Sequence, residues 1–238
     1  MLVLFWGLLC LILCAPAVKT SPRLVGLAAL LYALDVLVVT LPGWWHPLFL
    51  GLHMNWTGKL LSILLSLLVV YGWRLVSPQE VGLGRPLRGS WRIIGPIVLV
   101  FALANFAGGG VNRHHHAPPT WEAHLFELSM PGIAEELFTR GVFLGLLSRV
   151  FPRTIPFLGT RTSWGGLAGV VLFVLGHCLS FAGPLQLLPQ THFSPDLAVT
   201  AVYGTFFLWV RERSSSCWAA MAAHNLANVC LYVGLSMP

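Results

Sequence analysis

Apolar residues along the chain fall into eight blocks, separated by short segments that are polar or rich in Pro and Gly. Each block is close to the ~20 residues that a helix needs to cross a bilayer, although some are slightly shorter. The pattern therefore predicts an all-α protein, a polytopic transmembrane bundle of about eight membrane-spanning helices. The blocks cover residues 2–18, 24–41, 59–76, 93–111, 122–148, 164–183, 195–210 and 217–235.

The fifth block is longer and more amphipathic than the others. It predicts a short interfacial helix from Thr120 to Ser129, which turns at Pro131 into a helix that carries Glu135. We treat the chain as one integrated membrane domain. Within it, residues 1–121 form N-terminal transmembrane helices and loops, and residues 122–238 form a helical core.

The composition agrees with a membrane protein and argues against other classes. Hydrophobic residues make up 56% of the chain and charged residues only 9%, far below the ~25% of soluble domains. The net charge is +6, but the basic residues are scattered singly and form no stripe with aromatics, so we expect no nucleic-acid partner. The five cysteines lie in apolar runs without a CxxC pair, which argues against a disulfide framework or a cysteine-zinc site.

The distribution of basic residues predicts an orientation in the membrane. With eight helices and the N-terminus outside, the outer loops hold only Lys59 and Arg113, and Arg140 lies within a helix. Basic residues concentrate in cytoplasmic loops, so the bias predicts N-out and C-out in the plasma (inner) membrane. The other eleven, all in inner loops, are Lys19, Arg23, Arg74, Arg85, Arg88, Arg92, Arg149, Arg153, Arg161, Arg211 and Arg213.

The first block has a second interpretation, a signal peptide that is cleaved. Ala15-Pro16-Ala17 is a passable cleavage site. However, the block has no positive region before it, and its removal would invert the topology and reverse the charge bias. We therefore expect the first helix to be retained.

The run from Gly132 to Gly141 places two of the chain's eight acidic residues side by side in an apolar segment. Such charges cost several kcal/mol unless they are paired or face a wet cavity. Glu136 and Arg140 have the i, i+4 spacing of a helical ion pair. Glu135 lies about 100° round the helix and is expected to project alone, which suits a general base or acid. The alternative is a purely structural ion-pair network.

Three further polar residues lie inside later apolar blocks. His177 lies in the sixth block, and His224 and Asn228 lie in the eighth, where the i, i+4 spacing places them on one helical face. Taken singly, each is typical of a hydrogen bond between helices. Together with the glutamate pair they indicate a polar site within the membrane. The consecutive histidines His114, His115 and His116 lie in an outer loop, and we assign no function to them.

The order of these motifs resembles the CPBP family, the CAAX prenyl protease and bacteriocin-processing membrane proteins, also called Abi proteins. The core of the resemblance covers residues 122–235, and the segment Asn55-Trp56-Thr57-Gly58-Lys59-Leu60 looks like a stretch common in bacterial members. The motifs are EExxxR (Glu135, Glu136, Arg140), FxxxH (Phe173, His177) and HxxxN (His224, Asn228).

The resemblance implies an intramembrane endopeptidase of the glutamate type. Glu135 would be the general base, and His177 would help to hold and polarise the water. His224 and Asn228 would form the oxyanion hole. The remaining motif residues, Glu136, Arg140 and Phe173, would support them.

The older interpretation of the family is a zinc metalloprotease, in which Glu135, His177 and His224 would be the ligands. The chain lacks His-Glu-x-x-His, so we expect no cofactor, with zinc as the alternative. The expected partners are a protein or peptide substrate, lipidated or not, and membrane lipids. Two rival functions are a transporter or proton relay and a non-catalytic immunity-type protein with the same fold.

Overall fold

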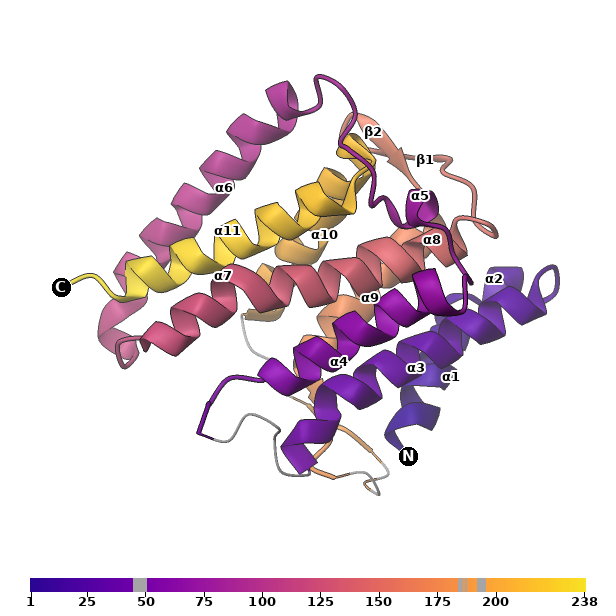
Figure 1. The fold of residues 1–238 in the computed structure, drawn as a ribbon, viewed down its shortest axis with the longest axis horizontal. Coiled ribbons are helices and arrows are strands. Elements are labelled where there is room, and N and C mark those ends of the chain that lie inside the picture. Colours follow the sequence, from indigo (N-terminus) through magenta and orange to yellow (C-terminus); the bar gives the residue numbers. More distant parts are fainter. Residues whose placement is uncertain (45–50, 184–185, 187, 192–195) are drawn as a thin grey trace.

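The computed structural model describes residues 1–44, 51–183, 186, 188–191 and 196–238, and shows a bundle of helices (Figure 1). The α-helices are α1 (Leu2–Leu13), α2 (Ala15–Val18), α3 (Pro22–Trp44), α4 (Trp56–Leu67), α5 (Pro78–Val81), α6 (Trp91–Asn112), α7 (Trp121–Glu136), α8 (Leu144–Leu147), α9 (Trp164–Cys178), α10 (Asp196–Ser214) and α11 (Cys217–Leu235).

Three helical segments of other types adjoin these helices. The π-helices η1 (Leu68–Gly72) and η3 (Leu137–Phe143) continue α4 and α7, and a 3₁₀ turn, η2 (Arg113–His115), follows α6. Two short antiparallel hairpins lie outside the helices. They pair β1 (Ile155–Phe157) with β2 (Thr160–Thr162), and β3 (Leu179–Ser180) with β4 (Gln190–Thr191).

The prediction of an all-α protein is confirmed, and each of the eight apolar blocks contains a helix. The sixth block is helical only to Cys178, because the chain then becomes extended and pairs as β3. Residue 195, the start of the seventh block, lies outside the described residues. Eight crossings are not confirmed. Among the described helices, Pro22–Trp44 and Trp91–His115 are long and apolar enough to cross a membrane, and three apolar helices are shorter.

Helix α7 runs without a break through Pro131, so the predicted turn there is wrong. A proline inside a helix removes one N–H and crowds the preceding turn. Asn225 of α11 compensates, since its Oδ1 accepts from the N–H of Gly132 at 2.7 Å and its Nδ2 donates to the carbonyl of Ser129 at 3.0 Å. A Cβ on Gly132 would overlap the Asn225 side chain, so the glycine allows this close approach.

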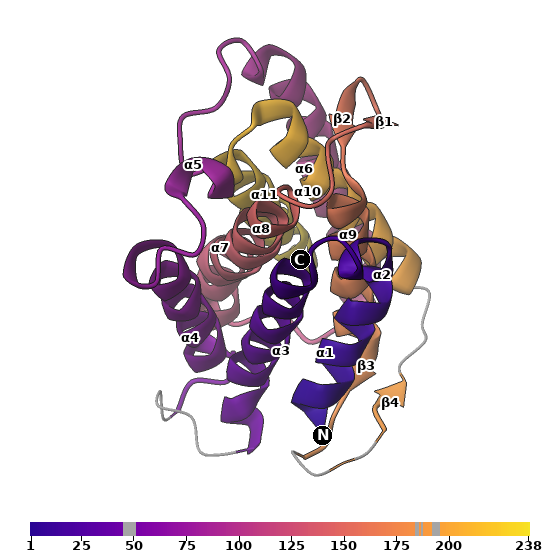
Figure 2. The same ribbon diagram turned by 90° about the vertical axis from the view of Figure 1, so that its right-hand side faces the viewer.

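Helix η3 lies at the centre of the bundle. In the described part of the chain, α1, α3, α4, α7, α11, α10 and α9 follow one another in space as a ring, and α6 packs outside it against α11 (Figures 1 and 2). All seven residues of η3 are buried inside that ring. A π-helix is uncommon and is frequent at functional sites, and this one begins directly after Glu136.

Two apolar clusters surround η3. The larger one includes Trp6, Tyr32 and Phe143, and the smaller one joins α6, α10 and α11 through residues such as Ile94 and Phe207. The contact between α6 and α11 depends on small residues, as is usual between membrane helices. A Cβ at Gly109 would overlap the backbone of α11, whereas Gly108 and Gly110 have open space around them.

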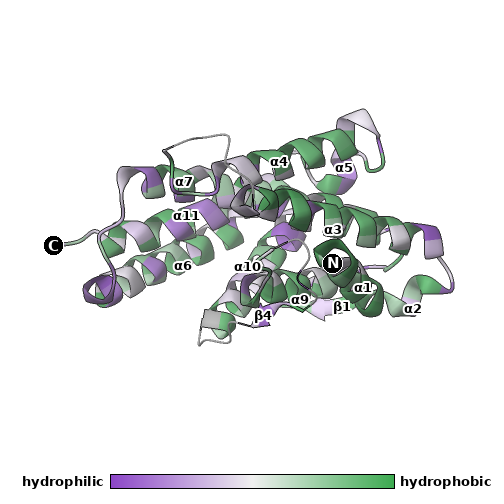
Figure 3. Ribbon diagram, turned by 90° about the horizontal axis from the view of Figure 1, so that it is seen from below, coloured by the Kyte–Doolittle hydropathy of each residue, from purple (hydrophilic) through white to green (hydrophobic). Residues whose placement is uncertain are grey.

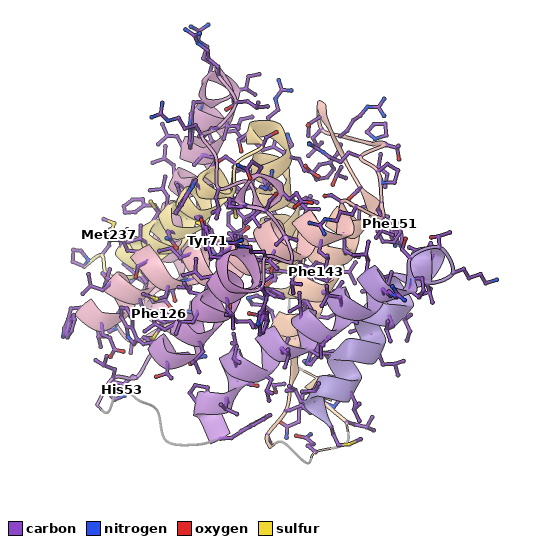
Figure 4. All side chains as sticks on the ribbon, turned by 45° about the vertical axis from the view of Figure 1, so that its right-hand side comes forward. His53, Tyr71, Phe126, Phe143, Phe151 and Met237 are labelled. Carbon is purple, nitrogen blue, oxygen red and sulfur yellow. The ribbon has the colours of Figure 1, made fainter. Side chains whose placement is uncertain are left out.

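The loops with most of the basic residues gather at one end of the bundle. The Glu80 carboxylate, in α5, accepts two hydrogen bonds from Arg149 at 2.6 and 2.8 Å, and Leu87 donates its N–H to the carbonyl of Ser214. The Arg149 guanidinium lowers the pKa of Glu80 to about 2, with help from hydrogen bonds of Ser77. Phe151 lies at this end and His53 at the opposite one (Figure 4).

The outer surface of the helices is apolar. Large side chains such as Leu4, Leu64, Val100 and Val202 are more than half exposed. Figure 3 shows hydrophobic residues along most of α1, α3 and α4, with hydrophilic ones at the loops. Soluble monomers rarely expose contiguous apolar surface on this scale. The surface therefore suits contact with lipid.

Candidate active site

A cleft of about 740 Å³ enters the bundle from the end that holds the N-terminus. Near its mouth it is lined by Trp44, by the loop from His53 to Asn55 and by Phe181, and its inner wall includes Glu135 and His177. Helices α1, α3, α4, α7 and α9 all contribute side chains. The cleft thus connects one surface of the bundle with the glutamate motif.

Glu135 does not project alone, and that prediction is wrong. Its Oε1 accepts a hydrogen bond from the Nζ of Lys59 at 2.5 Å, and the two side chains are 20% and 13% exposed. Lys59 was assigned to an outer loop, but it lies in the first turns of α4, which packs on α7. The other oxygen, Oε2, is buried and accepts no hydrogen bond from any described residue. One oxygen is therefore held while the second remains free.

His177 lies at the C-terminal end of α9 and is exposed to the cleft. Its Nδ1 is 2.8 Å from the carbonyl of Phe173 one turn earlier. Because a carbonyl only accepts, Nδ1 carries the proton, and in the neutral ring Nε2 is an acceptor. The cleft wall thus carries Nε2 of His177 as an acceptor, beside the Glu135 carboxylate, whose Oε2 is buried in this structure.

Glu136 lies in a different environment from Glu135. Its Oε1 is 3.2 Å from NH1 of Arg140 and 2.9 Å from Nδ1 of His224, and the predicted pair with Arg140 is confirmed. The carboxylate is fully buried, and Arg140 also donates to the carbonyl of Gly204 at 2.9 Å. His224 stacks on Phe207 with centroids 4.3 Å apart. These contacts join α7, η3, α10 and α11 into one buried polar network.

Phe173 separates this network from the cleft. Its ring lies 4.5 Å from that of His177 and 6.4 Å from that of His224, and the guanidinium of Arg140 lies 4.4 Å above it. The ring lines the cleft on one side and covers the cation on the other. A cation over an aromatic face is stabilised by the ring quadrupole.

Asn228 lies one turn after His224 on α11, and its Nδ2 donates to Oε2 of Glu127 at 2.7 Å. Glu127 is buried on α7. Neither His224 nor Asn228 lines the cleft as the structure describes it. The structure therefore brings Glu135 and His177 together at the cleft, and it places the two predicted oxyanion donors against buried carboxylates behind it.

Protein-family models were compared with the chain, and one of them matches the part that contains these motifs. Residues 118–230 match the model described as "Type II CAAX prenyl endopeptidase Rce1-like". The match covers just under half of the chain and supports the CPBP family of CAAX proteases. No curated protein and no solved structure gives a significant match to the chain.

The match to this family model supports an endopeptidase activity in a membrane. The match covers all three motifs, including the catalytic candidates Glu135, His177, His224 and Asn228. It does not reach Lys59, which comes from the N-terminal half. The family assignment thus leaves the contact made by that lysine unexplained.

The side chains that the structure describes show no grouping typical of a metal centre. Within the described ranges, no three His, Cys, Asp or Glu side chains come close enough to hold a metal ion. Of the alternative ligand set, Glu135 is engaged by Lys59, and Nδ1 of His224 is engaged by Glu136. A zinc ion would have to bind His224 through Nε2.

Sequence reasoning missed four polar residues around the motifs. Lys59 and Glu127 bond to motif residues, Asp35 lines the same cleft, and Asn225 bonds to the backbone of α7. A signal for two of them was present, since Asp35 and Lys59 lie within or at the edge of apolar blocks, where an unpaired charge is costly. Asn225 lies between His224 and Asn228 and gave no separate signal. Its role depends on Pro131 of another helix.

Proposed function

We propose that the protein is an intramembrane endopeptidase of the glutamate type, in which Glu135 activates a water for attack on a peptide bond. The observation that supports it most strongly is the state of this carboxylate. Oε1 is held by Lys59, Oε2 is unpartnered among the described residues, and His177 lies on the same cleft. A water that donates one hydrogen to Oε2 and the other to Nε2 of His177 would turn a lone pair toward a substrate carbonyl.

In the proposed reaction, Glu135 takes a proton from the water as the new oxygen–carbon bond forms. The carbonyl oxygen then carries a negative charge. Glu135 returns the proton to the leaving nitrogen and the carbon–nitrogen bond breaks, which gives a carboxylic acid and an amine; the acid then passes its proton to the amine, so that the final products are a carboxylate and an ammonium group. The base ends in its starting state, so no further reactant is consumed.

We propose, as the resemblance implies, that Nε2 of His224 and the second N–H of Asn228 form the oxyanion hole; neither lines the cleft, so Phe173 would have to turn aside to admit the carbonyl oxygen. Because Nδ1 of His224 faces Glu136, the ring can donate from Nε2 only in the form with a proton on both nitrogens. Asn228 uses one of its two N–H groups on Glu127. Removing a donor of this kind typically costs ~10²–10³ in rate.

We propose a substrate with a lipidated C-terminal segment. The family description names prenylated substrates, and the cleft offers apolar side chains beside the charged wall, including Leu2, Trp6 and Val36. A prenyl chain against these residues would leave the neighbouring peptide near Glu135. Peptide precursors without a lipid are the alternative substrate, as the resemblance implies.

We further propose that eight helices cross or enter the plasma membrane, with both termini outside. Their loops alternate between two ends of the bundle, and the end with the N-terminus is also the end where the cleft opens. On this topology the site is reached from outside the cytoplasm. A reporter fused to the C-terminus that folds only outside the cytoplasm is expected to be active.

The proposed mechanism uses no metal. We expect activity to be unchanged after incubation with a chelator, measured on the purified protein with and without added zinc. Activity lost to the chelator and restored by zinc would instead support the zinc mechanism on Glu135, His177 and His224.

The proposed function is tested by comparing peptide termini in membrane fractions from cells that express wild type or Glu135→Gln at equal levels. Glutamine keeps the shape of the side chain but accepts no proton. We expect new termini with wild type alone, and they would identify the substrate. Identical termini in both fractions would contradict proteolysis and favour the transport or immunity-type function.

A further inference from the structure

The cleft contains a second carboxylate, which the mechanism above does not use. Asp35 of α3 lines the cleft, and its Oδ1 accepts a hydrogen bond from Ser62 at 2.5 Å. Ser62 lies three residues after Lys59 on α4, so their side chains share a helical face. Lys59 therefore projects from the face of α4 that meets Asp35, and it ends on Glu135.

Lys59 is well placed to orient the base. Among the described residues that line the cleft, it is the only lysine or arginine. It occupies Oε1 and leaves Oε2, which is buried beside the cleft, without a hydrogen-bond partner among the described residues. A charge-assisted hydrogen bond of this kind is short and directional, so it fixes the rotation of the carboxylate. Without it, two equivalent oxygens could turn toward any donor in the cleft.

Asp35 supplies a negative charge for Lys59 during the reaction. Once Glu135 has taken the proton from water it is neutral, and Lys59 would become an unpaired cation in an apolar bundle. Such a charge costs several kcal/mol. Asp35 makes no ion pair with Lys59 in this structure, but it lines the same cleft and is held by Ser62, so the lysine side chain would turn to it at that stage. The proton itself stays on Glu135 until it passes to the leaving nitrogen.

We propose that Lys59 is a positioning residue that holds one oxygen of Glu135 and leaves the other for water, and that Asp35 keeps Lys59 paired while Glu135 carries the proton. The proposal rests on the proposed function. It assigns part of the active site to α3 and α4, outside the residues that match the family.

Other charged or titratable side chains also lie around Glu135. His177 faces it from α9, His224 from α11, Asp35 from α3 and Glu127 from α7. Of these, His224 and Glu127 are already held by Glu136 and Asn228, and the Nδ1 of His177 by a carbonyl. Lys59 alone donates directly to the carboxylate of Glu135 in the described residues.

A rival role for Lys59 is to bind the free carboxylate at the C-terminus of the substrate. The two roles separate in the kinetics. A residue that acts through the base lowers kcat and leaves KM nearly unchanged, whereas a residue that binds the substrate in both ground and transition states raises KM.

The experiment measures kcat and KM of the purified full chain on a fluorogenic peptide that ends in S-farnesyl-cysteine and three further residues. The variants are Lys59→Met, Lys59→Arg, Asp35→Asn and the double variant Lys59→Met/Asp35→Asn. Lys19→Met is the matched control, because Lys19 is the other lysine of the chain and is exposed in the loop between α2 and α3. Glu135→Gln measures the background.

We expect Lys59→Met to lower kcat by ~10²-fold, the typical effect of a misplaced catalytic group, with KM within about 2-fold of wild type. Lys59→Arg should recover most of the loss because the cation is kept. Asp35→Asn should lower kcat by less than Lys59→Met. In the Lys59→Met background it should have little further effect, since residues that act through one another are not additive. The control should match wild type.

The melting temperature of each variant shows whether a loss of activity comes from unfolding or from a misplaced Glu135 carboxylate. If Lys59→Met unfolds, Lys59→Arg and Asp35→Asn still test the proposal through kcat and KM. A raised KM at unchanged kcat, or Asp35→Asn with wild-type kcat, would overturn it. If wild type and Glu135→Gln cleave equally, the proposed function fails. If Glu135→Gln is inactive while Lys59→Met equals wild type, only the role of Lys59 fails.

Discussion

Glu135 and Glu136 are neighbours in the chain and identical in chemistry, but they lie in two different environments. Glu135 faces a cleft, with one oxygen on a lysine and the other unpartnered among the described residues. Glu136 is fully buried, between Arg140 and His224. The step of about 100° per residue in a helix separates them. Each carboxylate has an Oε2 without a hydrogen-bond partner among the described residues, so it is the position on the cleft that marks Glu135 as the reactive group and Glu136 as the structural one.

The buried member of the pair should matter most for stability. We expect Arg140→Met to destabilise the protein by ~3–5 kcal/mol, because it leaves the carboxylate of Glu136 buried without its cation. The measurement is unfolding of the purified protein in denaturant. Arg88→Met is the matched control, since Arg88 is exposed in the loop before α6. Equal stability of the two variants would show that Glu136 does not depend on Arg140.

The position of helix α7, which carries both glutamates, depends on its close contact with α11. We expect Asn225→Ala to cost ~1–3 kcal/mol, because it leaves the N–H of Gly132 and the carbonyl of Ser129 without partners beside Pro131. The same unfolding measurement applies. Asn112→Ala serves as control, since Asn112 is exposed and bonds only within its own helix in the described structure. A wild-type midpoint for Asn225→Ala would contradict this role.

The exposed pair Glu80–Arg149 offers a contrast with the buried pair Glu136–Arg140. The pKa of Glu80 in the folded protein, about 2, lies below the ordinary value of 4.5 for a glutamate. The stabilisation is therefore present in full above pH 4.5 and is lost as pH falls toward 2. Solvent and salt screen an exposed pair, so the effect is small.

The test compares the melting temperatures of wild type and Glu80→Gln across this pH range. We expect a small difference near pH 6 that shrinks as pH falls from about 4.5 toward 2. A difference that stays constant with pH would mean that Glu80 stabilises through packing or its cap rather than through charge.

The amino-acid sequence predicts much of this molecule because the decisive patterns are local. Eight apolar blocks predict helices that are present, and the spacing of Glu136 and Arg140 predicts an ion pair that is present. Contacts between distant elements could not be predicted in this way. Lys59 and Glu135 are 76 residues apart, and only the packing of α4 on α7 brings them together.

Two further features depended on tertiary contacts. Pro131 is a local signal for a break, but Asn225 from another helix satisfies the backbone groups and the helix continues. The extended segment after Cys178 follows from pairing with β4. The number of membrane crossings remains a prediction from charge and length.

The difference between the two glutamates is tested most directly by measuring activity and stability of Glu135→Gln and Glu136→Gln side by side, on the farnesylated peptide and by thermal unfolding. We predict that Glu135→Gln loses ~10²–10⁴ in kcat, the usual contribution of a general base, and keeps its fold. Glu136→Gln should lower the melting temperature markedly. Glu135→Gln with wild-type kcat, or Glu136→Gln with wild-type stability, would contradict the assignment of one reactive and one structural carboxylate.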